Sequence, residues 1–103
     1  MLEHKRQGDV LLIAVDRLPE GGVEVPRVNG RIIVKAGEQT GHHHAITAPK
    51  VKMIEVRGTR YIAAEQPFDM VHEEHTVAHF EARIYMVPEQ VEYTPEAIRR
   101  VLD

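Results

Sequence analysis

The sequence contains no cysteine and no tryptophan, and among its 103 residues there are only three tyrosines and two phenylalanines. The lack of cysteine excludes both a disulfide framework and a metal site built from thiolates. Any metal ion would therefore be bound by imidazole and carboxylate groups. The shortage of aromatic residues predicts a core made mainly of valine, isoleucine, leucine, methionine and alanine side chains.

Long apolar segments and basic clusters are missing as well. The longest apolar run, Val10–Val15, is far shorter than the roughly 20 residues that a membrane-spanning helix needs. The net charge is −3, and no block of lysine and arginine marks a nucleic-acid-binding surface. The first residues lack the apolar stretch of a signal peptide. We therefore expect one cytoplasmic domain spanning residues 1–103 that binds neither nucleic acid nor membranes.

Short apolar runs separated by glycine and proline predict a mainly β fold. The run Val10–Val15 is predicted as a strand buried on both faces, and Gly30–Lys35 as a second strand. Residues 51–57 and 60–64 predict a hairpin joined at Gly58-Thr59. Short strands at this spacing are typical of a small β-barrel or sandwich.

The segment Thr76–Val87 is predicted as the longest strand. Apolar residues alternate with polar ones along it, which predicts one apolar face made of Ala78, Phe80, Ala82, Ile84 and Met86. His79 falls on the polar face, and we expect it to be a surface residue. Beyond this strand the pattern changes, because Thr94 is a favourable N-cap residue and is followed by proline and glutamate. A short C-terminal α-helix is therefore predicted over Thr94–Leu102.

Seven histidines are unusual in a chain of this length. His42 and His44 are two residues apart, so on an extended segment both imidazoles project from one face and His43 projects from the other. This H-x-H arrangement is a common half of a site for zinc, iron, copper or nickel, because neutral imidazole is a good ligand for all of these metals. Taken alone, the run would also fit a polar surface loop.

A second histidine window lies at His72-Glu73-Glu74-His75. Histidines three residues apart share a face on a helix or in a tight turn, and the chain between Pro67 and the following strand is predicted to bend here. The spacing excludes the zinc-metalloprotease motif H-E-x-x-H, whose histidines are four residues apart. Taken alone, this window would also fit a solvated, charged turn.

Two such windows in one small chain together predict a single mononuclear metal site. The predicted ligands are His42, His44, His72 and His75. Zinc is the default ion because it accepts tetrahedral coordination by nitrogen atoms, while iron, nickel, copper and manganese stay open. Three carboxylates are candidates for a further ligand, for a partner that orients an imidazole, or for a catalytic acid or base acting on metal-bound water: Glu38, Glu73 and Glu74.

Part of this pattern is similar to the first motif of the cupins, which contains a glycine, an H-x-H pair and a glutamate. Gly37 and His42-x-His44 correspond to its first two features, whereas Ala48 and Pro49 stand where the motif has its glutamate. The resemblance implies a metal-dependent, oxygenase-type activity as one alternative.

Over nearly its whole length the chain resembles a family of small uncharacterised bacterial and phage proteins. The shared motifs are Q-G-D-V-L-L at Gln7–Leu12, G-E-x-T-G-H-x-H at Gly37–His44, H-E-E-H at His72–His75 and Y-x-V-x-x-Q-x-E-Y at Tyr85–Tyr93. The resemblance implies that the four predicted ligands belong to the family's pattern and that His43 and His79 do not. It implies no activity.

Three functions fit these observations. In the first, the protein is a binding or structural module that a closed metal site stabilises. In the second, it is a hydrolase or a cupin-like oxygenase in which one coordination position is open to water or substrate. In the third, it is a subunit of a phage or defence assembly, or a homo-oligomer, that makes contacts through strand edges. The number of protein ligands on the metal separates the first function from the second.

Overall fold

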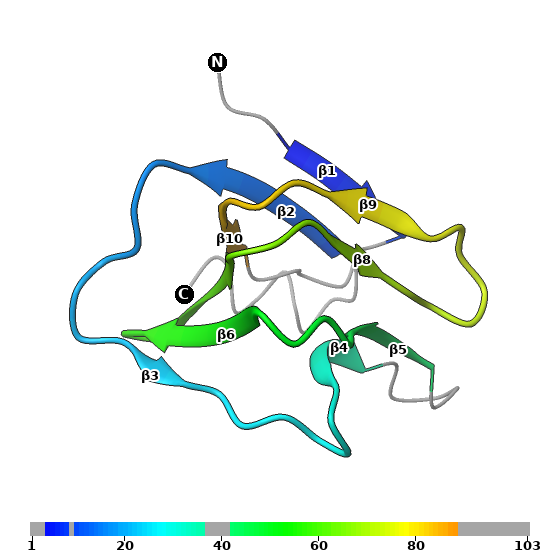
Figure 1. The fold of residues 1–103 in the computed structure, drawn as a ribbon, viewed down its shortest axis with the longest axis horizontal. Coiled ribbons are helices and arrows are strands. Elements are labelled where there is room, and N and C mark those ends of the chain that lie inside the picture. Colours follow the sequence, from blue (N-terminus) through cyan, green and yellow to red (C-terminus); the bar gives the residue numbers. More distant parts are fainter. Residues whose placement is uncertain (1–3, 9, 37–41, 89–103) are drawn as a thin grey trace, which may run out of the picture.

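The computed structural model describes residues 4–8, 10–36 and 42–88 and shows a mainly β fold, which confirms the predicted fold class at this level (Figure 1). The strands are β1 His4–Gln7, β2 Val10–Val15, β3 Val23–Glu24, β4 Ile32–Ala36, β5 His43–Ile46, β6 Val51–Val56, β7 Thr59–Ala64, β8 Phe68–Met70, β9 Ala78–Phe80 and β10 Ile84–Val87. Within these ranges no helix has the length and apolar character to cross a membrane. The helix predicted over Thr94–Leu102 lies outside the described residues.

Six of the strands form one antiparallel sheet in the order β1-β2-β10-β7-β6-β3. The other strands form two separate two-stranded ribbons, β4–β5 and β8–β9. The predicted barrel is wrong, because among the described residues β1 and β3 lie at opposite ends of the large sheet and do not pair with each other. The two-residue strand β3 is exposed and too short to extend the sheet far enough to close it.

One hydrophobic core joins the sheet and the two ribbons. All three contribute fully buried side chains to it, including Leu12 from β2, Ile46 from β5, Ile62 from β7 and Met70 from β8. The core is mainly aliphatic, as predicted, and its aromatic part is the group Phe68, Phe80 and Tyr85. Both ribbons are therefore held against the large sheet by shared burial of apolar surface.

The predicted strand Val10–Val15 is present as β2, but it is fully buried on one face only. Val10, Leu12 and Ala14 are buried, and the residues between them are half-buried. β2 is the second strand of a hairpin whose first strand, β1, has a polar sequence that did not predict a strand. The register pairs Gln7 with Val10, and Gly8 lies in the turn that connects the two strands.

The predicted hairpin at residues 51–64 is present as β6 and β7, with its turn one residue earlier than expected. Val56 pairs with Thr59, so the turn residues are Arg57 and Gly58, not Gly58 and Thr59. Both turn residues have positive φ, 48° and 84°. This is the backbone geometry of the tight hairpin turns that match the twist of antiparallel strands, and glycine favours it because it has no Cβ atom.

The single strand predicted over Thr76–Val87 is wrong. The segment forms two strands in different sheets: β9 pairs with β8, whereas β10 pairs with β2 and β7. Phe80 and Tyr85 are both buried, although a continuous strand would place residues five apart on opposite faces. The chain bends at Ala82-Arg83, and the Tyr85 hydroxyl donates a hydrogen bond to the Glu81 carbonyl oxygen across the bend. The apolar faces of β9 and β10 are thereby both turned to the core.

Candidate metal centre

His44 lies on β5, in the ribbon that pairs His44 with Lys35 of β4. Its side chain is only 3% exposed. A buried imidazole needs hydrogen-bond partners, and Nδ1 of His44 lies 2.9 Å from Oε1 of Gln7 at the end of β1. The segment His43–Ile46 is extended, and the ring of His44 is fixed in the interior and not in a solvated loop.

A single bridge between β5 and the end of β8 places His72 beside His44. The main-chain N–H groups of Ala45 and Val71 each donate to the carbonyl oxygen of the other residue, at 2.9 Å. In an antiparallel arrangement the next pair along is His44 and His72, whose side chains share a face and lie close together. The two ring centroids are 4.3 Å apart.

His75 joins this pair because the chain bends directly after His72, as the sequence predicted. The ring centroid of His75 lies 4.5 Å from that of His72 and 5.8 Å from that of His44. One ring nitrogen from each of these three histidines lies within 4.8 Å of the others, which is close enough for the three to hold a metal ion. His44 is buried, His72 half-buried and His75 exposed, so the group reaches from the core to the surface.

His42 lies beside the three histidines and is not a member of the group that they form. Its ring meets that of His72 edge-on, with the centroids 5.6 Å apart. Its Nδ1 atom lies 3.2 Å from a carboxylate oxygen of Glu74. The predicted H-x-H pair is therefore placed with His44 in the group and His42 at its border. Glu38 lies outside the described residues.

The hydrogen bond of the His72 ring determines which of its two nitrogen atoms carries the proton. The main-chain N–H of Glu74 donates to Nδ1 of His72 at 3.0 Å, so the neutral ring carries its proton on Nε2. Ligation through Nδ1 would replace this hydrogen bond, and ligation through Nε2 would require the proton to move to Nδ1. In either case, metal binding would break the contact between His72 and the backbone of the bend.

Glu73 is anchored to the backbone of β5. The main-chain N–H of His43 donates to its carboxylate at 3.0 Å. This hydrogen bond, together with one from the main-chain N–H of Glu73 itself, lowers the pKa of the carboxyl group below its usual value. His42 and His72 lower this pKa further through their charge. Glu73 is thus an ionised carboxylate close to the histidines, and the lowered pKa makes it a weaker base than an ordinary glutamate.

Comparison with known protein families shows the family to which the chain belongs. A family described as Domain of unknown function (DUF8820) matches residues 6–90. The chain belongs to the DUF8820 family. No curated protein matches the chain, and no solved structure matches it. The DUF8820 match includes Gln7 and every histidine of the site, and the family description names no activity, so the function must be argued from the geometry.

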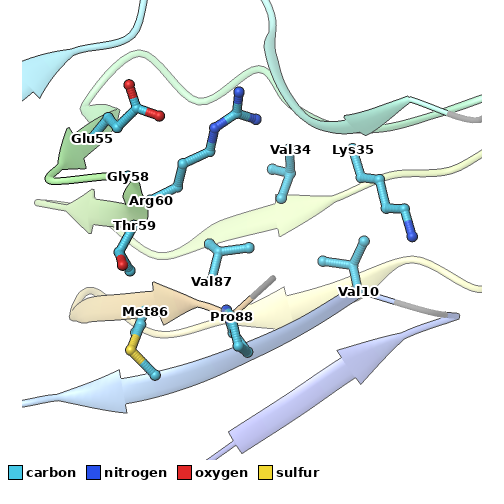
Figure 2. A pocket seen from close by; sticks show the side chains of 10 residues that line it. All are labelled: Val10, Val34, Lys35, Glu55, Gly58, Thr59, Arg60, Met86, Val87 and Pro88. Atoms are coloured by element: carbon cyan, nitrogen blue, oxygen red, sulfur yellow. The ribbon is translucent and has the colours of Figure 1, made fainter. Parts of the chain in front are cut away.

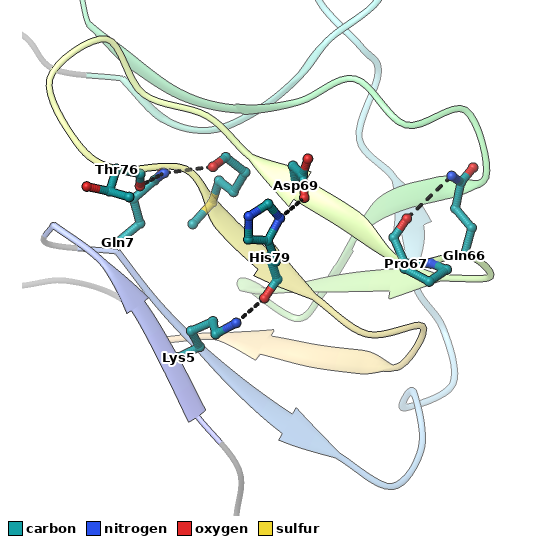
Figure 3. A network of polar contacts seen from close by, with 8 residues as sticks. Lys5, Gln7, Gln66, Pro67, Asp69, Thr76 and His79 are labelled. Atoms are coloured by element: carbon teal, nitrogen blue, oxygen red, sulfur yellow. Dashed lines mark hydrogen bonds and ion pairs between the residues drawn. The ribbon is translucent and has the colours of Figure 1, made fainter.

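His79 is not part of the group of three in this DUF8820 domain. It lies on β9 opposite Asp69 of β8, and its Nδ1 atom is 2.5 Å from a carboxylate oxygen of Asp69 (Figure 3). Lys5 of β1 donates from its amine to the main-chain carbonyl of His79. Both members of the His79–Asp69 pair are largely exposed, and such pairs contribute little to stability.

We expect His79→Ala to leave metal content unchanged and to shift the melting temperature by at most about 5 °C, because it removes one exposed ion pair. Elemental analysis and thermal melting of the variant check this. A loss of metal comparable with that caused by His75→Ala would mean that β9, and not the bend before it, supplies a ligand.

Two pockets in the described part of the DUF8820 domain lie outside the group of three histidines. One, of about 520 Å³, contains no histidine and is lined by Val10, Val34, Lys35, Glu55, Gly58, Thr59, Arg60, Met86, Val87 and Pro88 (Figure 2). The other, of about 440 Å³, lies beside Asp69 and His79. Neither is lined by His44, His72 or His75.

The sequence did not point to Gln7 as part of the site. Its only signal was its place at the start of the Q-G-D-V-L-L motif at Gln7–Leu12, which implied no role in the site. A glutamine in a polar segment gives no indication of burial, yet Gln7 is only 3% exposed. It is buried because the turn between β1 and β2 lies against the bend that carries His72 and His75.

Proposed function

We propose that this domain binds one transition-metal ion through His44, His72 and His75, and that the ion stabilises the fold. The observation that carries the proposal is the convergence of three ring nitrogens within 4.8 Å of one another from two separate parts of the chain. Surface histidines have no reason to converge in this way, and here one of them is buried with its Nδ1 atom hydrogen-bonded.

The donor set agrees with this assignment. Three neutral imidazoles suit zinc, copper, iron and nickel, and zinc accepts them in tetrahedral geometry with a fourth ligand. The ionised Glu73 carboxylate, which the His43 N–H holds beside β5, would add favourable negative charge near the ion. Zinc is therefore the metal that we propose, with His42 as the candidate for the fourth protein ligand because its ring lies against that of His72.

A structural role follows from what the ion would connect. His44 belongs to the β4–β5 ribbon and His72 and His75 belong to the connection between β8 and β9. Among the described main-chain contacts between these two parts is the bridge at Ala45 and Val71. A bound ion would add a further, stronger link at this point, in a chain that has no disulfide.

A second function is favoured by the count of histidines. Three of them form the group and His42 lies at its border, which leaves a coordination position for water or substrate, as in catalytic zinc sites. A hydrolase or a cupin-like oxygenase would use that position. The carboxylate of Glu74, which has an oxygen 3.2 Å from Nδ1 of His42, is then a candidate base.

Titration with zinc tests the proposal. We expect chain purified without an affinity tag and stripped with a chelator to bind one zinc ion per molecule, measured by competition with a chromophoric chelator. The His79→Ala variant should give the same stoichiometry. Absence of saturable binding would refute the proposal. The absorption spectrum of the cobalt-substituted protein then separates the two functions, because added azide changes it only if a coordination position is open.

A further inference from the structure

The turn between β1 and β2 contacts the proposed metal centre through the side chain of Gln7. The amide of Gln7 makes three hydrogen bonds: Oε1 lies 2.9 Å from Nδ1 of His44, and Nε2 donates to the carbonyl oxygens of Met70 at 2.7 Å and of Thr76 at 3.0 Å. Figure 3 shows this amide between the β1–β2 turn and the bend after β8. A glutamine amide with three partners in the interior has a single orientation.

That orientation determines the tautomer of His44. Carbonyl oxygens only accept hydrogen bonds, so the –NH2 group of Gln7 must face Met70 and Thr76 and its oxygen must face His44. Nδ1 of His44 must then be the donor. The neutral ring consequently carries its proton on Nδ1 and has its lone pair on Nε2, which is the form in which a histidine coordinates a metal through Nε2.

The same amide also fixes both ends of the bend. Met70 precedes His72 by two residues and Thr76 follows His75 directly. The two donor bonds of Gln7 therefore close the segment that carries two of the three histidines, while its acceptor oxygen orients the third.

The ring of His75 packs directly against Gly8, the next residue, and occupies the space that a side chain there would take. A Cβ atom at position 8 would be 2.4 Å from Nε2 and 2.8 Å from Cδ2 of His75, which is too close for any side chain. The φ angle of Gly8 is +58°, a conformation that residues with a Cβ rarely adopt. Because His75 is exposed, its ring can move away from an added Cβ atom, whereas the strain of the positive φ would lower the stability of the fold with or without metal.

We propose that Gln7 is a positioning residue of the metal centre, which holds His44 in the metal-binding tautomer and closes the His72–His75 bend, and that Gly8 leaves the space in which His75 reaches the other two rings. This inference rests on the proposed metal-binding function and adds to it a third segment, the β1–β2 turn. Outer partners that orient a ligating histidine commonly change metal affinity by about 10–100-fold.

The tautomer can be measured directly in the metal-free protein. Long-range ¹H–¹⁵N correlation spectra are expected to show His44 protonated on Nδ1 in the native chain, and protonated mainly on Nε2 or as a mixture in Gln7→Met. A native His44 protonated on Nε2, or an unchanged tautomer in the variant, would overturn the positioning role.

Metal affinity supplies the second readout. Gln7→Met should weaken zinc binding by about 10–100-fold, while the matched control Gln66→Met should leave it within about twofold. Gln66 is a suitable control because its amide also bonds to backbone atoms, of Lys50 and Pro67, away from the histidines. Should Gln7→Met fail to fold, Gln7→Glu serves instead: it keeps an acceptor for His44 and loses both donor bonds, so the tautomer should persist while affinity falls.

The role of Gly8 is tested by a double-mutant cycle with His75. Gly8→Ala should weaken zinc binding about as much as His75→Ala does, and the double variant should bind no more weakly than either single variant, because both changes remove the same ligand. Additive losses would show that Gly8 acts on something other than His75. If the native chain binds no zinc, the proposed function and this inference fail together; if it binds zinc and the variants at positions 7 and 8 bind equally well, only this inference fails.

Discussion

Replacing His44 and His72 together with alanine is expected to abolish tight metal binding. A structural zinc site contributes about 10–16 kcal/mol, so three or four ligands provide about 2.5–5 kcal/mol each, and the loss of each one weakens binding by roughly a hundredfold or more. Removal of two should leave affinity at the level of isolated histidines. Competition titration of the native chain and of the His44→Ala/His72→Ala variant measures the difference.

Single alanine variants show which of the four histidines are metal ligands. His44→Ala, His72→Ala and His75→Ala should each cost about a hundredfold or more in affinity. His42→Ala discriminates between the two functions: an equal loss would make it the fourth ligand of a closed site, and a loss of less than about tenfold would leave that position open. Circular dichroism checks that each variant is folded. Retention of one tightly bound ion by the His44→Ala/His72→Ala variant would contradict the assignment of both ligands.

Removing the metal is expected to lower the melting temperature substantially. An ion that binds only the folded chain adds about 4 kcal/mol of stability when its free concentration is about a thousand times the dissociation constant. For a domain of this size, 1 kcal/mol corresponds to about 4–8 °C. Zinc-loaded protein should therefore melt roughly 15–30 °C above the same protein in excess chelator. The shift is large because a domain of this size has a small entropy of unfolding, so each kcal/mol changes the melting temperature by several degrees.

The control for this melting experiment is the variant that lacks two of the three proposed histidine ligands. The His44→Ala/His72→Ala protein should melt at the same temperature with and without chelator, because it has no ion to lose. An unchanged melting temperature in a native chain shown to carry zinc would mean that the ion does not stabilise the fold. The open catalytic site would then be the better account of the same three histidines.

Short-range patterns predicted much of this structure. The short apolar runs between glycine and proline correctly placed β2, β6 and β7. The two histidine windows contain all three residues of the group, because an extended segment and a bend each bring particular side chains to one face. What brings the two windows together is a bridge between Ala45 and Val71, which depends on pairing between distant strands. Local spacing contains no information about such a pairing.

The errors have the same origin. The apolar and polar residues of 76–87 alternate as in one continuous strand, and only the partners of β9 and β10 in different sheets show that the chain changes sheet. Gln7 is similar: its residue type favours solvent, and it is buried because three hydrogen-bond partners from elsewhere in the chain surround its amide. The barrel prediction was wrong because a closed barrel requires the two edge strands, β1 and β3, to pair with each other. The sequence of a single strand does not define its pairing partner.

Anomalous diffraction at the zinc absorption edge, from crystals of the zinc-loaded chain, tests the central claim most directly. The proposed site predicts one strong peak per chain, about 2.0–2.1 Å from a ring nitrogen of each of His44, His72 and His75. The same map would show whether His42 or a water molecule completes the coordination. A peak at any other position, such as the exposed His79–Asp69 pair, or no peak in protein that titrates with one equivalent of zinc, would contradict the claim that these three histidines hold the metal.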